Sequence, residues 1–433
     1  MYETEGKTMT ALVLFGSLAL FLILTVPIGI SIGLSTLVTI LYSGSMPLEY
    51  LAQGLITSID SFPLLAVPFF ILAGEIMGKG GLSDRLFKVA NTIVGDKTGG
   101  IAIAAIITCM FFAAISGSGP ATVAAVGGIM IPAMIKQGYD KKFATAVVCA
   151  AGSIGVIIPP SIPMVMYGVV GSQSIGKLFI SGILPGILVG VALMTWTYIY
   201  SRKQGYKGIG KSTFKDFLKA TWDAKWALLV PIIILGGIYG GVFTPTEAAG
   251  VAVVYGFIAG VFLYRELKFR DIPRMLIDSG ITTATIMLIV GTATAFGRIL
   301  TVEQIPSQIT EGLLSISSNP IIILLLINIL LLIVGCFMDT VAAIIILTPL
   351  LLPVAMNIGV NPIHFGLIMV VNLAIGFITP PLGVNLFVGS GVSGISIEAL
   401  AKAVMPFFVA MVISLLILTY IPQVSLFLVE FME

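Results

Sequence analysis

Charged residues are scarce in this chain. Only 10% of its 433 residues are Asp, Glu, Lys or Arg, whereas 58% are hydrophobic. Soluble domains carry about 25% charged residues. A composition this apolar predicts an all-α polytopic membrane protein, with the lipid bilayer as its solvent. The net charge of +2 indicates no particular partner, and no nucleic-acid binding is predicted.

Other absences exclude whole chemistries. His364 is the single histidine, which excludes a His-rich metal site and a histidine proton relay. The three cysteines, Cys109, Cys149 and Cys336, lack metal-ligand or C-x-x-C spacing and are expected to be small buried side chains. No Walker A pattern is present, so the chain does not itself hydrolyse ATP, and no organic cofactor is predicted. Segment 11–43 lacks a cleavage site and is expected to be retained in the membrane.

Ten apolar segments are long enough for membrane helices. They form two sets of five: 10–43, 62–79, 99–136, 142–172 and 177–201, followed by 226–264, 280–300, 320–356, 362–392 and 400–421. Segments 10–43 and 226–264 are long enough for helix pairs. Segments 99–136 and 320–356 have small or polar residues at their centres, which predicts re-entrant hairpins with tips near mid-depth.

The second set repeats the first at a constant offset. The pattern Ile-Gly-(x3)-Pro-Pro at 154–160 returns at 375–381. Residues 1–201 and 226–433 are therefore predicted to be two repeats joined by 202–225. Each repeat would hold one hairpin and one broken helix, 142–172 or 362–392. Repeats with paired Pro/Gly breaks indicate a secondary transporter and mark its binding site.

The predicted topology makes the repeats inverted. Each half has five crossings and one hairpin, and an odd number of crossings starts the second half on the opposite side. With the N-terminus outside, 19 of the 22 Lys and Arg residues fall in cytoplasmic loops, as the positive-inside rule requires. Both termini are then periplasmic. The basic segment 202–225 is expected to be an amphipathic cytoplasmic connector at the headgroup level, and 83–96 another interfacial helix.

The two Pro-Pro breaks predict ion sites. Carbonyls about one turn earlier, around Ser153–Ile158 and Ala374–Thr379, should lose their helical partners. Unpaired carbonyls bind a dehydrated alkali cation, and half-helix N-termini suit a carboxylate. Purely structural kinks are the alternative. Together with the hairpin tips, the predicted Na⁺ ligands are Ser116, Gly117, Ser118, Gly119, Ser153, Ile158, Pro159, Gly335, Asp339, Thr340, Thr379 and Pro380.

Two charged residues in apolar segments are candidates for substrate binding. Asp339 is the symmetry mate of Ser118 and is expected to bind Na⁺ or substrate hydroxyls; a paired structural acid is the alternative. Arg298 offers a guanidinium fork for the substrate acid group, unless it snorkels to the interface or pairs with Glu75 or Glu303. The polar candidates near the tips and breaks are Ser118, Ser161, Tyr167, Ser172, Ser174 and Asn385.

These motifs resemble the large membrane (M) subunit of the tripartite ATP-independent periplasmic (TRAP) transporters, in order and over essentially the whole chain. The matching segments are PFFILAGEIM (68–77), ISGSGPAT (115–122), IGVIIPPSIPM (154–164), GVFTPTEAAG (241–250), CFMDT (336–340) and GFITPPLGVNLF (376–387). The resemblance implies a Na⁺-coupled importer of organic acids in the bacterial inner membrane. A mobile domain holding the hairpins and broken helices would slide against a scaffold, as an elevator.

The resemblance also implies two protein partners. These are a small four-helix membrane subunit (Q) and a soluble periplasmic substrate-binding protein (P). No four-helix segment precedes the first repeat, so a separate small subunit is expected. The overall pattern is nearest to sialic-acid members, with C4-dicarboxylate as the other substrate class. The related stand-alone dicarboxylate/sodium symporters carry Ser-Asn-Thr at their hairpin tips, and neither tip here does.

Two other classes of function compete with a coupled carrier. An intramembrane serine hydrolase would use Ser118 as nucleophile and His364 as base. It explains Gly117-Ser118-Gly119 but not the repeat, and His364 lies at the start of a crossing. A passive channel would also use hairpins and broken helices, although the elevator family disfavours it.

Overall fold

The computed structural model describes residues 2–208 and 213–431, and every regular element in this part of the chain is helical. The helices of the first half are α1 (Tyr2–Ile23), α2 (Ile28–Ser43), α3 (Glu49–Thr57), α4 (Ala66–Lys79), α5 (Leu82–Val94), α6 (Gly100–Ser116), α7 (Gly119–Lys136), α8 (Lys141–Gly152), α9 (Ile162–Val170) and α10 (Ile175–Gln204).

The second half follows a short connecting helix, α11 (Phe214–Asp223). Its helices are α12 (Lys225–Tyr239), α13 (Pro245–Ile258), α14 (Ile272–Val302), α15 (Ile305–Ile316), α16 (Pro320–Phe337), α17 (Thr340–Asn357), α18 (Pro362–Gly376), α19 (Val384–Ser393), α20 (Ile397–Tyr420) and α21 (Gln423–Glu430).

Membrane-spanning elements dominate the described residues. Eight helices are long and apolar enough to cross a bilayer, or up to nine if α11 and α12, bent by 63°, make one span. Shorter apolar helices include most of α1, all of α2, the hairpin arm α6, and the two parts α18 and α19 of a broken helix. The protein is therefore a multi-pass membrane protein, while the number of ten crossings stays a prediction.

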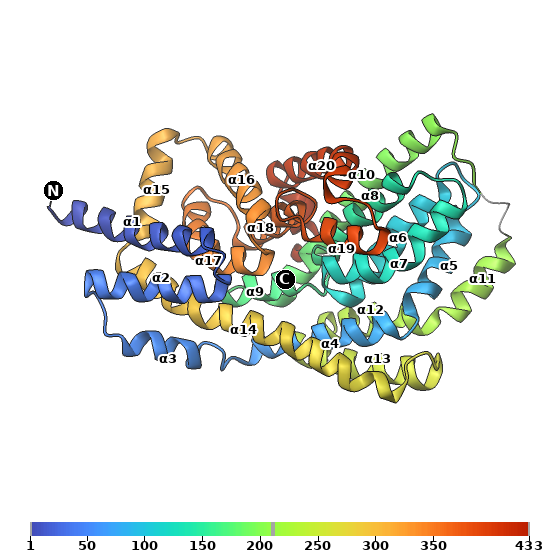
Figure 1. The fold of residues 1–433 in the computed structure, drawn as a ribbon, viewed down its shortest axis with the longest axis horizontal. Coiled ribbons are helices and arrows are strands. Elements are labelled where there is room, and N and C mark those ends of the chain that lie inside the picture. The colour runs from blue at the N-terminus through green and yellow to red at the C-terminus, as the bar shows by residue number, and fades with distance from the viewer. Residues whose placement is uncertain (1, 209–212, 432–433) are drawn as a thin grey trace.

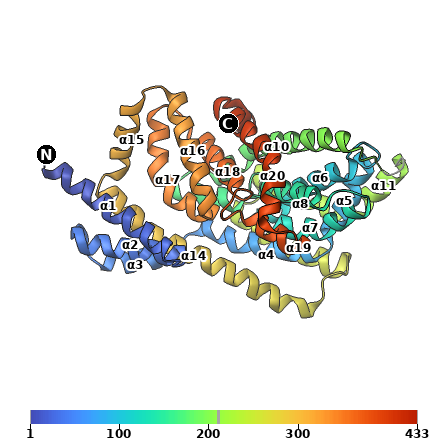
Figure 2. The same cartoon turned by 45° about the horizontal axis from the view of Figure 1, so that its top comes forward.

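The helices form an elongated layer and a bundle that packs on it (Figure 1). The layer contains α2, α3, α4, α13 and α14, with α14 packed against α2, α3 and α4, and α13 against α4. The bundle contains the two predicted hairpins, α6–α7 and α16–α17, together with α8, α9, α10 and α18 to α20. Turning the molecule by 45° keeps α14 along the edge of the bundle (Figure 2).

Helix bounds in the two halves follow the offset seen in the sequence. Helix α7 covers 119–136 and α17 covers 340–357, while α8 begins at Lys141 and α18 at Pro362. The start signals also correspond: the side chains of Asp140 and Asn361 accept the first N–H groups of α8 and α18. Helix α20 packs on α8, and α10 packs on α18. Each half therefore completes the other's core.

The two predicted interfacial segments are helical in the structure. Segment 83–96 falls on α5, and the described part of the connector contains α11, whose apolar residues Phe214, Leu218 and Trp222 are exposed at four-residue spacing. Arg85 of α5 joins these regions. Its guanidinium lies 2.6 Å from the carboxylate of Glu266 and 3.9 Å from that of Asp223, and it stacks at 3.9 Å on the ring of Tyr264.

Substitution of Gly376 by alanine should destabilise the bundle. A Cβ at Gly376 would overlap the carbonyl group of Gly335, whereas a Cβ at the helical Gly391 would meet nothing within 4 Å. Because overpacking costs about 1–3 kcal/mol, Gly376→Ala should lower the midpoint of thermal unfolding in detergent. Gly391→Ala is the matched control, and equal midpoints for the two variants would contradict this packing.

Candidate functional site

The first hairpin turns at Gly117 and Ser118, between α6 and α7. Gly117 has φ +61°, a conformation that favours glycine. The Ser118 hydroxyl accepts the N–H of Ala121 and so begins α7. The hydroxyls of Ser116 and Thr122 lie 3.0 Å apart, and that of Thr122 donates to the Ser118 carbonyl at 2.8 Å. The tip is a closed polar turn, and the hydroxyls of Ser116 and Thr122 are buried in it.

This tip packs directly on the first broken helix. A Cβ at Gly155 would lie 2.6 Å from the Ser118 carbonyl oxygen, and one at Gly117 would lie 2.8 Å from that of Pro160. The N–H of Ile162, which opens α9, donates to the Gly117 carbonyl at 3.4 Å. Glycine at both positions permits this backbone approach.

The second hairpin turns at Met338 and Asp339 and packs on the second broken helix in a related way. The N–H of Leu382 donates to the Cys336 carbonyl at 2.9 Å, and Gly335 lies against Gly376. The Asp339 carboxylate accepts the N–H of Val341 at 3.0 Å and begins α17, as Ser118 begins α7. Asp339 is exposed in the isolated chain.

The segment Gly376–Phe377 contacts both tips. Gly376 lies on Gly335 of the second hairpin, while the ring of Phe377 covers Gly119 of the first. A Cβ at Gly119 would come within 2.9 Å of that ring. The structure therefore brings both hairpin tips and both helix breaks to one place, as the sequence predicts for its binding region.

The carbonyls without partners lie at the breaks themselves rather than one turn earlier. The upstream carbonyls of Ile154 and Ile375 accept N–H groups in tight turns, because i→i+3 bonding replaces the lost helical bonds. Within the described residues, no hydrogen bond reaches the carbonyl oxygens of Ile157, Ile158, Pro159 and Pro160, or those of Ile378, Thr379, Pro380 and Pro381. Each Pro-Pro bond in these segments is cis.

Asn385 connects the two breaks. Its amide donates to the Cys149 carbonyl at 3.0 Å and to the Ser153 hydroxyl at 3.2 Å, while the Cys149 thiol donates to the Asn385 carbonyl. Asn385 is fully buried, and its side-chain oxygen has no hydrogen-bond partner among the described residues. A buried, unpaired amide oxygen is an available cation ligand.

Several predicted site residues have structural contacts. The Ser161 hydroxyl begins α9 and donates to the Val156 carbonyl at 2.6 Å. The Tyr167 hydroxyl donates to the Pro362 carbonyl at 2.7 Å and ties α9 to α18. The side chain of Ile158 lies against Gly186 of α10.

Four further candidates lie at or beyond the tips and breaks. Ser172 and Ser174 are exposed beyond the far end of α9, with Ser174 at the start of α10. Thr379 donates to the Ile375 carbonyl at 2.8 Å, and Thr340 is buried beside Asp339.

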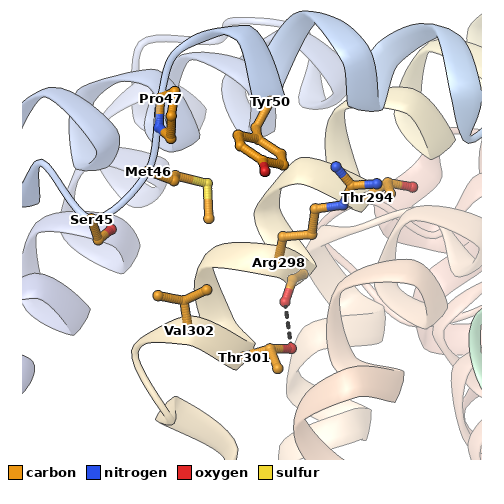
Figure 3. A pocket seen from close by; sticks show the side chains of 9 residues that line it. Ser45, Met46, Pro47, Tyr50, Thr294, Arg298, Thr301 and Val302 are labelled. Atoms are coloured by element: carbon orange, nitrogen blue, oxygen red, sulfur yellow. Dashed lines mark hydrogen bonds between the residues drawn. The ribbon is translucent and has the colours of Figure 1, made fainter.

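Arg298 lies in a separate cavity of about 580 Å³, between α14 and the α2–α3 loop. Its guanidinium extends toward Tyr50 and lies 5.9 Å from that ring (Figure 3). In the described part of the chain Arg298 forms no ion pair with Glu75 or Glu303. Glu75 pairs instead with Lys79, at 3.3 Å. Hydroxyls of Thr294 and Thr301 complete the polar lining. The cavity therefore presents one unpaired positive charge on the layer.

His364 contacts neither hairpin tip. Its Nδ1 lies 2.7 Å from the Ser425 hydroxyl and its Nε2 lies 3.3 Å from the Thr419 carbonyl, at the α18–α20–α21 junction. A hydrolase that pairs Ser118 with His364 has no support in this geometry. No cluster of His, Cys, Asp or Glu that could hold a metal ion occurs among the described residues, so a cation would be bound by neutral oxygens or by Asp339.

The fold is that of known membrane transporters. The YdaH transporter of Alcanivorax borkumensis has a similar structure, with a TM-score of 0.58 and 16% identity over 86% of this chain and 88% of that one. MtrF of Neisseria gonorrhoeae gives a TM-score of 0.59 with 13% identity over 86% of this chain and 83% of that one. At these identities the likeness concerns the fold alone.

The chain belongs to the tripartite ATP-independent periplasmic transporters as a DctM component, the family whose model matches residues 15–424. It is 55% identical over 416 residues to the isethionate TRAP transporter permease protein DctMQ of Oleidesulfovibrio alaskensis, covering 96% of this chain and 66% of that protein. The family consists of transporter permeases, not enzymes, which excludes the hydrolase.

Other relatives carry different substrate names. The C4-dicarboxylate TRAP transporter large permease protein DctM of Pseudomonas aeruginosa is 46% identical over 92% of this chain and 93% of its own length. The sialic acid TRAP transporter large permease protein SiaM of Vibrio cholerae is 39% identical over 96% of this chain and 97% of its own. The resemblance to TRAP large subunits is therefore confirmed, while the substrate is not set by family membership.

Cysteine labelling should report on the second tip. Cys336 is partly exposed beside it, whereas Cys109 and Cys149 are buried. Because a thiol must reach the reagent to react, a small water-soluble maleimide should add a single label to the folded protein. Cys336→Ser should abolish the label, and Cys109→Ser should retain it. A label that persists in Cys336→Ser, measured by intact-protein mass spectrometry, would contradict this placement.

Proposed function

We propose that this chain is the translocating subunit of a Na⁺-coupled importer of a small organic anion. The observation that carries the proposal is the convergence of both hairpin tips on the two breaks. Each break holds four carbonyls without hydrogen bonds, and the segment Gly376–Phe377 contacts both tips. At the first break, where Ile157, Pro159 and Pro160 are buried, such carbonyls are costly unless an ion or water binds them. At the second break Pro380 and Pro381 are exposed in the isolated chain.

Sodium fits this chemistry. It is bound by neutral oxygen ligands in protein interiors, as carbonyl rings bind cations in channels. The break carbonyls, the Ser153 hydroxyl and the unpaired Asn385 amide oxygen supply such ligands. Asn385 follows the second break and donates hydrogen bonds to residues beside the first break. An ion bound at the Asn385 side-chain oxygen would therefore stabilise the contact between the two halves. This links sodium occupancy to the arrangement of the tips.

The anion would be recognised by asymmetric groups. Ser118 and Asp339 occupy matching places at the two tips, so the pair differs in charge but not in position. Asp339 would accept hydrogen bonds from substrate hydroxyls. Arg298, unpaired in its separate cavity, would attract the acid group before the substrate reaches the tips. Relatives named for isethionate, C4-dicarboxylates and sialic acid share one property, a small anion that carries polar groups.

An elevator movement of the bundle against the layer is the proposed mechanism. Helix α4 of the layer meets the first tip through Gly74, where a Cβ would lie 3.2 Å from the Ser116 backbone. Small residues at such a boundary let the two backbones approach closely, with no bulky side chain between them to block a shift. The proposed partners, in the bacterial inner membrane, are a small four-helix subunit and a periplasmic substrate-binding protein.

Reconstitution tests the proposal directly. Proteoliposomes that contain this chain and its small subunit, supplied with the binding protein, should accumulate isethionate, succinate or sialic acid under an inward Na⁺ gradient. Replacing Na⁺ by choline should abolish accumulation because the ion sites stay empty. Undiminished accumulation in choline would contradict sodium coupling. Accumulation without the binding protein would instead indicate a stand-alone symporter.

Removing the charge of Asp339 should reduce uptake while preserving the fold. Asp339→Asn keeps an acceptor for the Val341 N–H, so the start of α17 is retained. Since a hydrogen bond to a charged group contributes about 1.5–3 kcal/mol, uptake should fall about 10- to 100-fold. Asp216→Asn, which changes a capping carboxylate on α11, should leave uptake unaltered. Wild-type uptake by Asp339→Asn would remove this carboxylate from the site.

A further inference from the structure

A second cavity, away from the tips and breaks, lies where three helix ends meet. It has a volume of about 650 Å³ and is bounded by the start of α8, the last turns of α10 and the start of α20. Trp196 and Tyr200 contribute aromatic side chains, and Arg202 and Lys203 follow in the last turn of α10. Trp and Tyr beside Lys and Arg at helix ends are typical of the depth of lipid headgroups.

The cavity lining combines both signs of charge with aromatic rings. Lys142 and Lys402 supply two cations, while Asp140 and Glu398 supply two carboxylates. None of these four side chains forms an ion pair within the described residues, because every salt bridge found there joins other residues. The ring of Phe143 is stacked at 4.2 Å on that of Tyr200 and forms part of the lining. A ligand with both charges would be complementary to this set.

An apolar strip continues from the cavity along α20. Met405, Val409 and Ile413 are each about half exposed, at 51%, 50% and 53%. Their four-residue spacing places them on the same face of α20 as Glu398 and Lys402. A polar cavity that leads into an apolar strip fits an amphiphile, with its head in the cavity and its chain along the helix.

The corresponding position in the other half is filled by the chain itself. The internal repeat relates α8 to α18 and α10 to α20, so the equivalent of this cavity lies where the start of α18, the start of α10 and the end of α20 meet. There α21 packs against α10 and α18, and its Ser425 lies 2.7 Å from His364. Helix α21 therefore fills, in one half, the position that corresponds to the open cavity in the other half.

We propose that the open cavity bounded by α8, α10 and α20 is a site for a phospholipid whose headgroup carries a phosphate and an ammonium group. The phosphate pairs with Lys142 and Lys402, and the ammonium pairs with Glu398 and Asp140. The aromatic rings surround the headgroup, and one acyl chain follows Met405, Val409 and Ile413. Phosphatidylethanolamine has this chemistry, whereas phosphatidylglycerol lacks the ammonium group.

Native mass spectrometry of the purified protein in nanodiscs tests this site. Discs of equal phosphatidylethanolamine and phosphatidylglycerol content should yield wild-type protein that retains phosphatidylethanolamine. Since a basic residue near a lipid headgroup contributes enough to change affinity about fivefold, Lys142→Gln and Lys402→Gln should each lower that retention about fivefold. Glu398→Gln should shift retention toward phosphatidylglycerol, because the ammonium loses its partner.

Lys141→Gln is the matched control, because Lys141 is exposed beside Lys142 but does not line the cavity. Its retention should equal that of the wild type. Equal lipid retention by all variants would overturn the proposal, as would a wild-type preference for phosphatidylglycerol. Soluble phosphoethanolamine that displaces the lipid at equal concentration would overturn the role of the acyl chain. Unchanged thermal unfolding midpoints separate loss of the site from loss of the fold.

Discussion

The constraint on which this structure depends is the cost of an unpaired backbone carbonyl away from water. Each Pro-Pro pair stops a helix inside the bundle and leaves four carbonyls without hydrogen bonds. The surroundings are arranged around this deficit. Glycines at the tips and breaks allow backbone to approach backbone, side-chain caps restart α9 and α17, and Asn385 bonds one break to the other. Polar backbone contacts therefore organise the centre of the bundle, inside a core of apolar side chains.

Much of this architecture could be predicted from the sequence, because its signals are local. Long apolar runs give the long helices, and paired prolines and glycines give the breaks and tips. The hairpin 320–356 and the interfacial segment 83–96 correspond closely to α16–α17 and α5. Similarly, capping residues determine where helices begin. These features need only neighbours along the chain, so one sequence suffices to locate them.

Other features depend on contacts that a single sequence does not encode locally. The short helices α3, α15 and α21 are too brief to give a membrane-helix signal. The upstream carbonyls regain partners through tight turns, which moves the unpaired oxygens into the breaks. The sequence predicts that Tyr167 and Ser161 line a pocket, but their hydroxyls donate hydrogen bonds to backbone carbonyls. Arg298 faces the α2–α3 loop, which belongs to the other half of the chain, and no local pattern reveals that pairing.

Ser118 and Asp339 show how two hairpin tips with the same backbone role can differ in charge. Both begin a helix by accepting an N–H, and that task is performed equally well by a hydroxyl or a carboxylate. A position of this kind tolerates a change of charge without a change of backbone. The two tips therefore differ in charge, while the surrounding glycines and prolines give both breaks the same kind of backbone. The capping residue that begins the second arm of each hairpin is therefore free to differ in charge between the two tips.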